Sequence, residues 1–216
     1  YKGSVLRGSL GHAFKRLFCL TRRGICRDCM FISRCAYAYV FETLSQTVRG
    51  YINHHYVPHP FIIEPPLDGK STYMAGDKLE FVLILIGRGL DYLPFFMASF
   101  EQAAMNGLGP ERGIFRLLSV EQLIQGRREP VWRGGYSMES EPVEEELTVS
   151  PDFADANIQM TDEITLELQT PTRFIKDNVP ASGISFSMLM RSIFRRLDYL
   201  GRATAAVLWM CLFRIC

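Results

Sequence analysis

The sequence of 216 residues lacks several features that would assign it to a large functional class. Its longest strongly apolar stretches, residues 81–86 and 203–213, fall short of the ~20 residues that a membrane-spanning helix needs. It contains no secretory signal pattern, no P-loop for nucleotide phosphates and no Gly-x-Ser-x-Gly nucleophile elbow. We therefore expect a cytoplasmic protein without a membrane partner, and neither a P-loop nucleotide hydrolase nor an α/β-hydrolase.

Net charge is low, +1 at pH 7, but the charges are segregated along the chain. Residues 1–51 carry +7 and residues 171–216 carry +5, whereas residues 52–120 carry −2 and residues 121–170 carry −9. Basic ends around an acidic middle favour a basic face that binds a polyanion; the alternative is a solvated mosaic of surface charges. With 48% apolar and 22% charged residues, the chain can bury a core, which excludes disordered, collagen-like and coiled-coil proteins.

Cysteine is scarce outside one cluster. Four of the six cysteines, Cys19, Cys26, Cys29 and Cys35, follow the spacing C-x6-C-x2-C-x5-C. In a reducing compartment such a cluster indicates a metal site more than disulfides. We predict a structural zinc, because four thiolates suit tetrahedral zinc and leave no open position for chemistry. An iron–sulfur cluster and unligated thiols are the alternatives.

Hydrophobic periodicity predicts an α+β fold over residues 1–121. The expected order is helix, strand, strand, helix, strand, and the cysteines lie in an insertion at residues 19–41 that has too little periodicity to build its own core. The predicted elements are residues 3–18, 58–64, 78–87, 92–106 and 113–121. One further strand before the first helix would complete a βαββαβ, ferredoxin-like domain, so this domain lacks its first strand.

The remainder divides into an acidic connector at residues 122–160 and a partial second ferredoxin-like domain at residues 161–216. Strict alternation of apolar and polar residues predicts an antiparallel strand over residues 163–170, and a helix is expected over residues 185–200. Residues 203–216 are apolar and show no closing strand pattern.

His12 is the strongest candidate for acid–base chemistry. Lys15 and Arg16 lie three and four residues further on and share one helical face with it. A histidine transfers protons near neutral pH, and a lysine or arginine stabilises charge on a phosphate. The alternative is a surface histidine. His54, His55 and His59 are rivals, but the first two lie in a polar loop and the third lies between two prolines.

Arginines and tyrosines alternate in the cysteine-rich insertion, a composition that suits phosphates with stacked bases. A basic stripe that includes Arg191 lies on the later helix, and a solvated surface is the alternative for both. The candidate RNA-binding residues are Arg7, Arg22, Arg23, Arg27, Arg34, Tyr37, Tyr39, Arg195 and Arg196.

Five segments together resemble the CRISPR repeat-processing endoribonucleases of the RAMP superfamily (CRISPR-associated family six). They are residues 1–17 (YKGSVLRGSLGHAFKRL), 35–43, 58–66, 107–115 and 170–174. The resemblance implies tandem ferredoxin-like domains related to RNA-recognition folds. It also implies cleavage of CRISPR repeat RNA without a catalytic metal, by attack of the RNA 2′-hydroxyl to give a 2′,3′-cyclic phosphate.

The resemblance places a family histidine on the first helix, which favours His12 as the acid–base group. It implies a prokaryotic, cytoplasmic protein, with other CRISPR effector subunits as further partners. The family's first strand and its C-terminal glycine-rich loop have no counterpart in this sequence, so we expect a shortened member. Two alternatives stay open: a non-catalytic subunit that holds guide RNA, and a zinc-stapled ferredoxin-like interaction domain.

Overall fold

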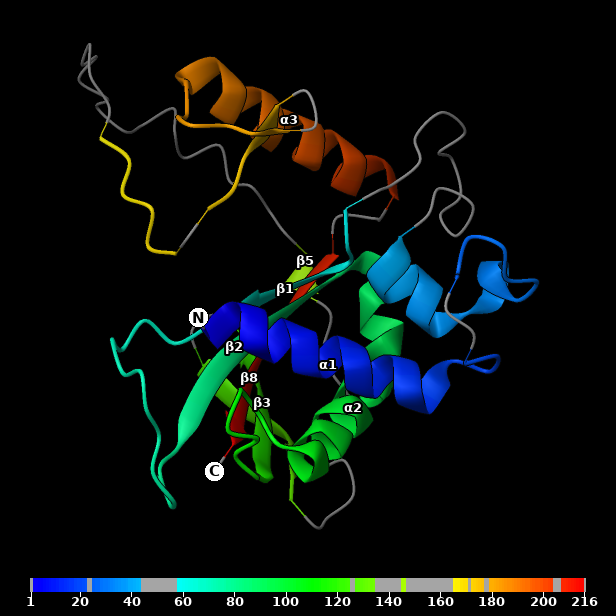
Figure 1. The fold of residues 1–216 in the computed structure, drawn as a ribbon, viewed down its shortest axis with the longest axis vertical. Helices are drawn as coiled ribbons and strands as arrows, with labels where there is room; N and C mark the ends of the chain where they lie inside the picture. Colours follow the sequence, from blue (N-terminus) through cyan, green and yellow to red (C-terminus); the bar gives the residue numbers. More distant parts are fainter. Residues whose placement is uncertain are drawn as a thin grey trace.

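The computed structural model is an α+β protein with one large antiparallel sheet and a separate two-stranded antiparallel hairpin (Figure 1). It describes residues 2–22, 25–43, 58–124, 127–134, 145–146, 165–170, 172–176, 179–203 and 207–215. The coarse prediction of a mixed α+β fold is confirmed. Within the described parts, no helix is both long and apolar enough to cross a membrane.

Two helices cover one face of the sheet and pack against each other (Figure 1). The first, α1 (Lys2–Phe18), buries the apolar stripe that includes Leu6, Leu10 and Phe14, as its periodicity predicts. The second, α2 (Leu93–Asn106), follows the 3-10 turn η4 (Gly87–Tyr92). Its boundaries agree with the predicted helix, because Pro94 suits a first turn and Gly107 suits the position after the last.

The main path of the sheet has the strand order β1-β2-β8-β3-β4, with every neighbouring pair antiparallel. A short strand, β5 (Glu145–Glu146), also pairs with β8. The five strands on the path are β1 (Phe61–Glu64), β2 (Leu79–Ile86), β3 (Leu117–Ile124), β4 (Arg127–Arg133) and β8 (Val207–Ile215).

The position of β8 differs from our expectation. The sequence placed residues 207–215 in a second unit without a strand pattern, whereas β8 lies at the centre of the first sheet, between β2 and β3. In the described part of this strand, Phe213 and Ile215 are buried in the core, whereas Arg214 between them is partly exposed and pairs with Glu80 and Glu121. This is the alternation of a strand with one covered face, and it is too short to be recognised after the apolar residues that precede it.

Two other predictions need correction. The strand predicted from residue 113 begins at Leu117 as β3, because residues 107–113 form a turn closed by a bridge between Leu108 and Gly113. In the described part of the predicted strand 163–170, residues 165–170 are not a strand, and Leu166 and Leu168 are 60% and 53% exposed. Alternation alone did not produce a strand there, because a strand also needs a partner to pair with.

Aromatic side chains dominate the core between the two helices and the sheet. The Phe213 ring on β8 stacks on Phe81 at 5.3 Å and tilts against Phe100 at 5.0 Å. Near the other end of α2, Phe14 and Phe61 both pack edge-on against Phe96. All of these rings are at most 2% exposed. The core therefore joins α1, α2, β1, β2 and β8 into one body.

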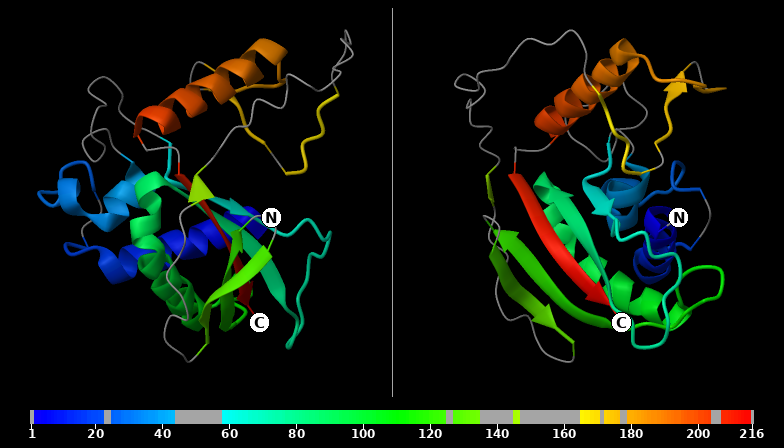
Figure 2. Two further views of the ribbon diagram at one scale, coloured as in Figure 1. Left: turned by 180° about the vertical axis from the view of Figure 1, so that it is seen from behind. Right: turned by 90° about the vertical axis from the view of Figure 1, so that its left-hand side faces the viewer.

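The third helix, α3 (Phe186–Ala203), follows a short hairpin of β6 (Ile175–Lys176) and β7 (Val179–Pro180). It matches the helix predicted over residues 185–200. It stands apart from α1 and α2 (Figures 1 and 2). Phe186, Phe194 and Leu197 are 64%, 60% and 58% exposed on it.

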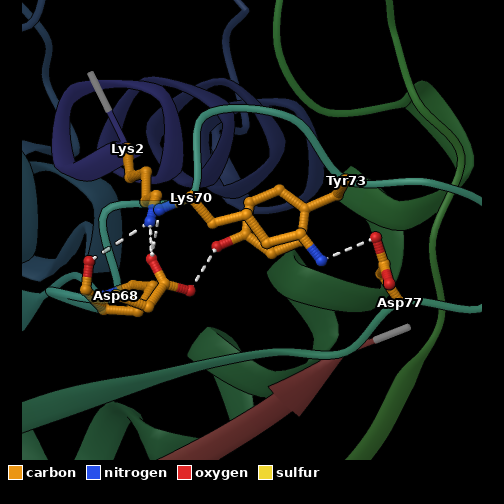
Figure 3. Close-up of polar contacts among 6 residues, drawn as sticks. Lys2, Asp68, Lys70, Tyr73 and Asp77 are labelled. Carbon is orange, nitrogen blue, oxygen red and sulfur yellow. Dashed lines mark hydrogen bonds and ion pairs between the residues drawn. The ribbon is translucent and has the colours of Figure 1, made fainter.

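A polar network fixes the start of α1 to the connection between β1 and β2 (Figure 3). The Lys2 ammonium pairs with the Asp68 carboxylate, and the Tyr73 hydroxyl donates to the same carboxylate at 3.1 Å. Lys70 pairs with Asp77 at 2.7 Å. Lys2 is therefore held on this side of the molecule.

Candidate functional site

A hollow of about 580 Å³ lies between α1 and the C-terminal end of α2. Helix α1 contributes Ser9, His12 and Arg16, and the turn that follows α2 contributes Gly107, Gly109 and Arg112. The rest of the lining is Ala103, Met105 and Asn106. The hollow is open to solvent and mixed in character, so it suits a polar ligand that enters from outside.

His12 and Arg16 share this hollow because they lie one helical turn apart on α1. Their neighbours on the opposite side of the helix, including Leu10 and Phe14, are buried in the core. Core packing on one face therefore presents the histidine and the arginine on the other. Both side chains are exposed, which leaves them accessible to a ligand.

Arg112 reaches the same hollow from a tight turn after α2. Leu108 and Gly113 exchange two backbone hydrogen bonds of 2.8 and 3.0 Å across this turn. Gly107 has a φ of 81°, and a Cβ there would lie 2.3 Å from the Arg112 carbonyl oxygen. Only glycine fits such a close approach. Sequence analysis missed Arg112, although its surrounding segment, residues 107–115, was one of the five that carried the resemblance.

The hollow has a positive character. Among the residues that the structure describes, its lining includes two arginines and a histidine and no aspartate or glutamate. Ser9 and Asn106 add a hydroxyl and an amide that can hydrogen-bond to a ligand. A phosphate is the kind of group that two arginines bind well, because the planar guanidinium matches phosphate oxygens in pairs.

Lys15 does not line this hollow, although we predicted it beside His12. Its ammonium lies 5.0 Å from the centre of the Tyr37 ring, where the electron-rich face of the ring attracts the cation. One residue along a helix turns the side chain by ~100°, so Lys15 faces the cysteine-rich insertion and Arg16 faces the hollow.

The four predicted metal ligands lie in one region beside α1. Cys19, Cys26, Cys29 and Cys35 are all partly buried and form no disulfide. The Thr21 hydroxyl lies 3.8 Å from the Cys19 sulfur and 4.0 Å from the Cys29 sulfur.

The environment of Cys26 disfavours its thiolate in the absence of a cation. Burial raises the pKa of Cys26 to about 11, and the nearby Glu42 carboxylate contributes to this rise. Among the described residues, no three Cys, His, Asp or Glu side chains form a set that could share an ion. The donor types fit zinc, but the described side-chain arrangement does not.

The tyrosines of the insertion have little free ring surface. Tyr39 is 8% exposed and stacks on Tyr92 at 5.1 Å, with the Arg88 guanidinium over its ring at 5.6 Å. Tyr37 stacks on Phe41 at 5.3 Å and contacts Lys15. The structure therefore argues against base stacking by these two rings, because other side chains already occupy their faces.

The predicted RNA-binding arginines fall into separate groups. Those of the insertion that are described (Arg22, Arg27 and Arg34) are exposed, and so is Arg195 on α3. Arg23 lies outside the described residues, as do the histidine candidates His54 and His55. None of these described arginines lines the hollow.

Comparison with protein-family models gives a match over the first two thirds of the chain. A family model described as an N-terminal domain matches residues 1–144, a range that begins at α1 and extends past β4. Neither the curated proteins nor the solved structures provide a match.

Proposed function

This chain belongs to the AF_1859_N family of N-terminal domains, and we propose that it is a CRISPR repeat RNA endoribonuclease that works without a catalytic metal. One observation carries this proposal: His12, Arg16 and Arg112 line a single solvent-open hollow, and no described residue in its lining is a carboxylate. The sequence resemblance supplies the substrate, and the hollow supplies a place for its phosphate.

In the proposed reaction, the 2′-oxygen of one nucleotide forms a bond to the adjacent phosphorus while the bond from phosphorus to the 5′-oxygen breaks. The His12 imidazole either takes the proton from the 2′-hydroxyl or gives one to the leaving 5′-oxygen, and solvent water makes the other transfer. Arg16 and Arg112 bind the non-bridging oxygens and stabilise the charge that develops there. The products carry a 2′,3′-cyclic phosphate and a 5′-hydroxyl.

The topology supports a ferredoxin-like assignment for the first domain, which we include in the proposal. In a βαββαβ domain, the first strand in chain order lies between the third and the fourth, antiparallel to both. The third and fourth strands of that order correspond here to β2 and β3. Strand β8 has this position and direction, between β2 and β3. We propose that residues 207–215 take the place of the first strand, which the sequence analysis expected to be absent.

Zinc at the four cysteines is a further part of the proposal, and it rests on the chemistry of the donors. A structural ion would be held by Cys19, Cys26, Cys29 and Cys35, and it would tie the arginine-bearing insertion to the end of α1. The described positions of these side chains would have to change to enclose it. No step of the proposed reaction runs through this ion.

A cleavage assay in EDTA tests the proposal. Purified protein is incubated with end-labelled RNA that contains the host's CRISPR repeat, and the product ends are mapped. We expect one cut that leaves a cyclic phosphate. The cut should disappear with a 2′-deoxy nucleotide at the cut site, and His12→Ala should slow it by ~10²-fold or more. Lys15→Met is the matched control and should keep its rate, because Lys15 contacts Tyr37 instead of the hollow.

A guide-RNA-holding subunit is the second candidate. Within the described residues, His12 has no hydrogen-bond partner that would orient its ring, and an acid–base group usually has one. Tight, salt-dependent binding of repeat RNA with no cut by the wild type would establish this second candidate and refute the enzyme.

A further inference from the structure

A second group of basic side chains lies on another side of α1 from the hollow. Arg7 is five residues before His12, which places the two about 140° apart around the helix. Arg7 instead lies over Phe61, a ring that His59 also contacts from the segment before β1, and the charge of Arg196 on α3 acts on both Arg7 and His59. Figures 1 and 2 show the C-terminal end of α3 close to the segment that leads into β1.

The ring of Phe61 is the common contact of Arg7 and His59. The Arg7 guanidinium carbon lies 4.7 Å from the centre of this ring, and the centre of the His59 ring lies 6.0 Å from it. Phe61 is only 2% exposed, so it is a fixed surface for both groups. The Nδ1 atom of His59 lies 3.3 Å from the Thr43 hydroxyl, which fixes the orientation of the imidazole.

Arg196 completes the group from α3. Burial lowers the pKa of Arg7, and the charge of Arg196 lowers it further. Burial also lowers the pKa of His59 to about 4, with contributions from Arg7 and Arg196. The Arg196 side chain is exposed, but neighbouring protein atoms still remove part of its hydration, and this desolvation lowers its own pKa. The basic groups of α1, of the segment before β1 and of α3 are thus close enough for their charges to affect one another's pKa values.

No carboxylate offsets this charge among the residues that the structure describes. Arg7 and Arg196 form no ion pair there, and the interactions that shift their pKa values include no acid. Arginines elsewhere differ: Arg214 pairs with Glu80 at 2.6 Å, and Arg88 pairs with Asp91 at 3.6 Å. The charge of Arg7 is partly buried, and such a charge without a counter-ion is unfavourable, so this group is suited to an external anion.

We propose that Arg7, His59 and Arg196 form a second anion site that binds a phosphate of the RNA backbone. The guanidinium groups donate paired hydrogen bonds to phosphate oxygens, and the imidazole adds a donor or acceptor beside them. The site does not require cleavage; it rests on the proposed function only in taking RNA as the source of the phosphate. RNA that follows α1 from the hollow would then contact the helix on two sides.

Salt-dependent binding tests this site. The probe is repeat RNA with a 2′-deoxy nucleotide at the cut site, so that binding is measured without cleavage. The affinity of the full chain is measured at several salt concentrations for the wild type, Arg7→Gln, Arg196→Gln and Arg88→Gln. Arg88 is the matched control, because it also lies over an aromatic ring but has a carboxylate partner.

We expect Arg7→Gln and Arg196→Gln each to weaken binding about tenfold and to reduce the slope of log K against log salt by about 0.7. Arg88→Gln should change neither quantity. Arg7→Lys keeps the charge and should restore most of the slope. An unchanged slope in a folded Arg7→Gln variant, with its urea midpoint as the folding check, would overturn the proposal.

Inorganic phosphate separates the two sources of the anion. We expect it to compete with RNA only at millimolar concentration. Micromolar binding of inorganic phosphate that is lost in Arg196→Gln, with RNA binding unchanged, would assign the site to a free anion and refute an RNA contact. The cleavage assay with His12→Ala is independent of these results, so the enzyme and the second site can fail separately.

Discussion

Replacing Phe213 by alanine tests the central position of β8. Phe213 is fully buried, pairs with Phe81 across β2 and with Val120 across β3, and also packs against Phe100. Truncation of a buried phenylalanine costs about 3–5 kcal/mol. That range already includes the loss of ring contacts such as those that Phe213 makes with Phe81 and Phe100. We therefore expect the free energy of unfolding to fall by about 4 kcal/mol.

Urea denaturation followed by circular dichroism measures this change. With an m-value of about 2.5 kcal/mol/M, a loss of 4 kcal/mol lowers the midpoint by roughly 1.5 M. The matched control is Phe194→Ala on α3, because that ring is 60% exposed. The control should change the free energy of unfolding by no more than about 0.5 kcal/mol.

The refuting result is equally specific. If Phe213→Ala lowers the free energy of unfolding by less than about 1 kcal/mol, then β8 does not contribute a core side chain and cannot be the central strand. Equal losses in Phe213→Ala and Phe194→Ala would also refute the reasoning, because burial would then not explain the effect.

Two further perturbations address the turn after α2 and the histidine near β1. Gly107→Ala should destabilise the protein by about 1–3 kcal/mol and slow RNA cleavage, because the new Cβ would collide with the Arg112 carbonyl. The control is Gly113→Ala, whose Cβ would make only an ordinary contact at 3.8 Å, so it should change the urea midpoint little. Equal effects of the two substitutions would contradict this account. The pKa of His59 is about 4 in the folded protein, against an ordinary value of 6.5. Between these two pH values the imidazole is protonated in the unfolded chain but not in the folded protein. The free energy of unfolding of the wild type should therefore fall as the pH drops from 6.5 to 4. His59→Gln should lose less stability over that interval in urea titrations at each pH, and parallel curves for the two proteins would contradict the burial of this imidazole.

Local patterns predicted the helices well. The apolar stripe of α1, and the proline and glycine at the two ends of α2, are properties of neighbouring residues, and the structure confirms both helices. The position of β8 depends on pairing with β2, more than 120 residues earlier. No local pattern encodes such a partner, so an apolar run was identified without its place in the sheet.

The candidate site likewise combines residues that local spacing predicts with residues that only the fold brings together. The spacing of His12 and Arg16 predicted a shared helical face, and both residues line the hollow. Helical spacing also suggested Lys15, but tertiary packing brings an aromatic ring to its ammonium. Arg112 comes from a different part of the chain, and only the path of the turn after α2 brings it to the same hollow. The role of these residues in catalysis stays a prediction.

The central place of β8 has a consequence for how the protein is made. Strands β2 and β3 leave the ribosome more than 80 residues before Val207, so both present unpaired backbone edges to the solvent during synthesis. Exposed edges of this kind bind other extended chains and promote aggregation. Closure of the sheet requires contacts between distant parts of the chain, which makes folding slow. Productive expression of this protein should therefore depend on chaperones and on low temperature more than its modest size suggests.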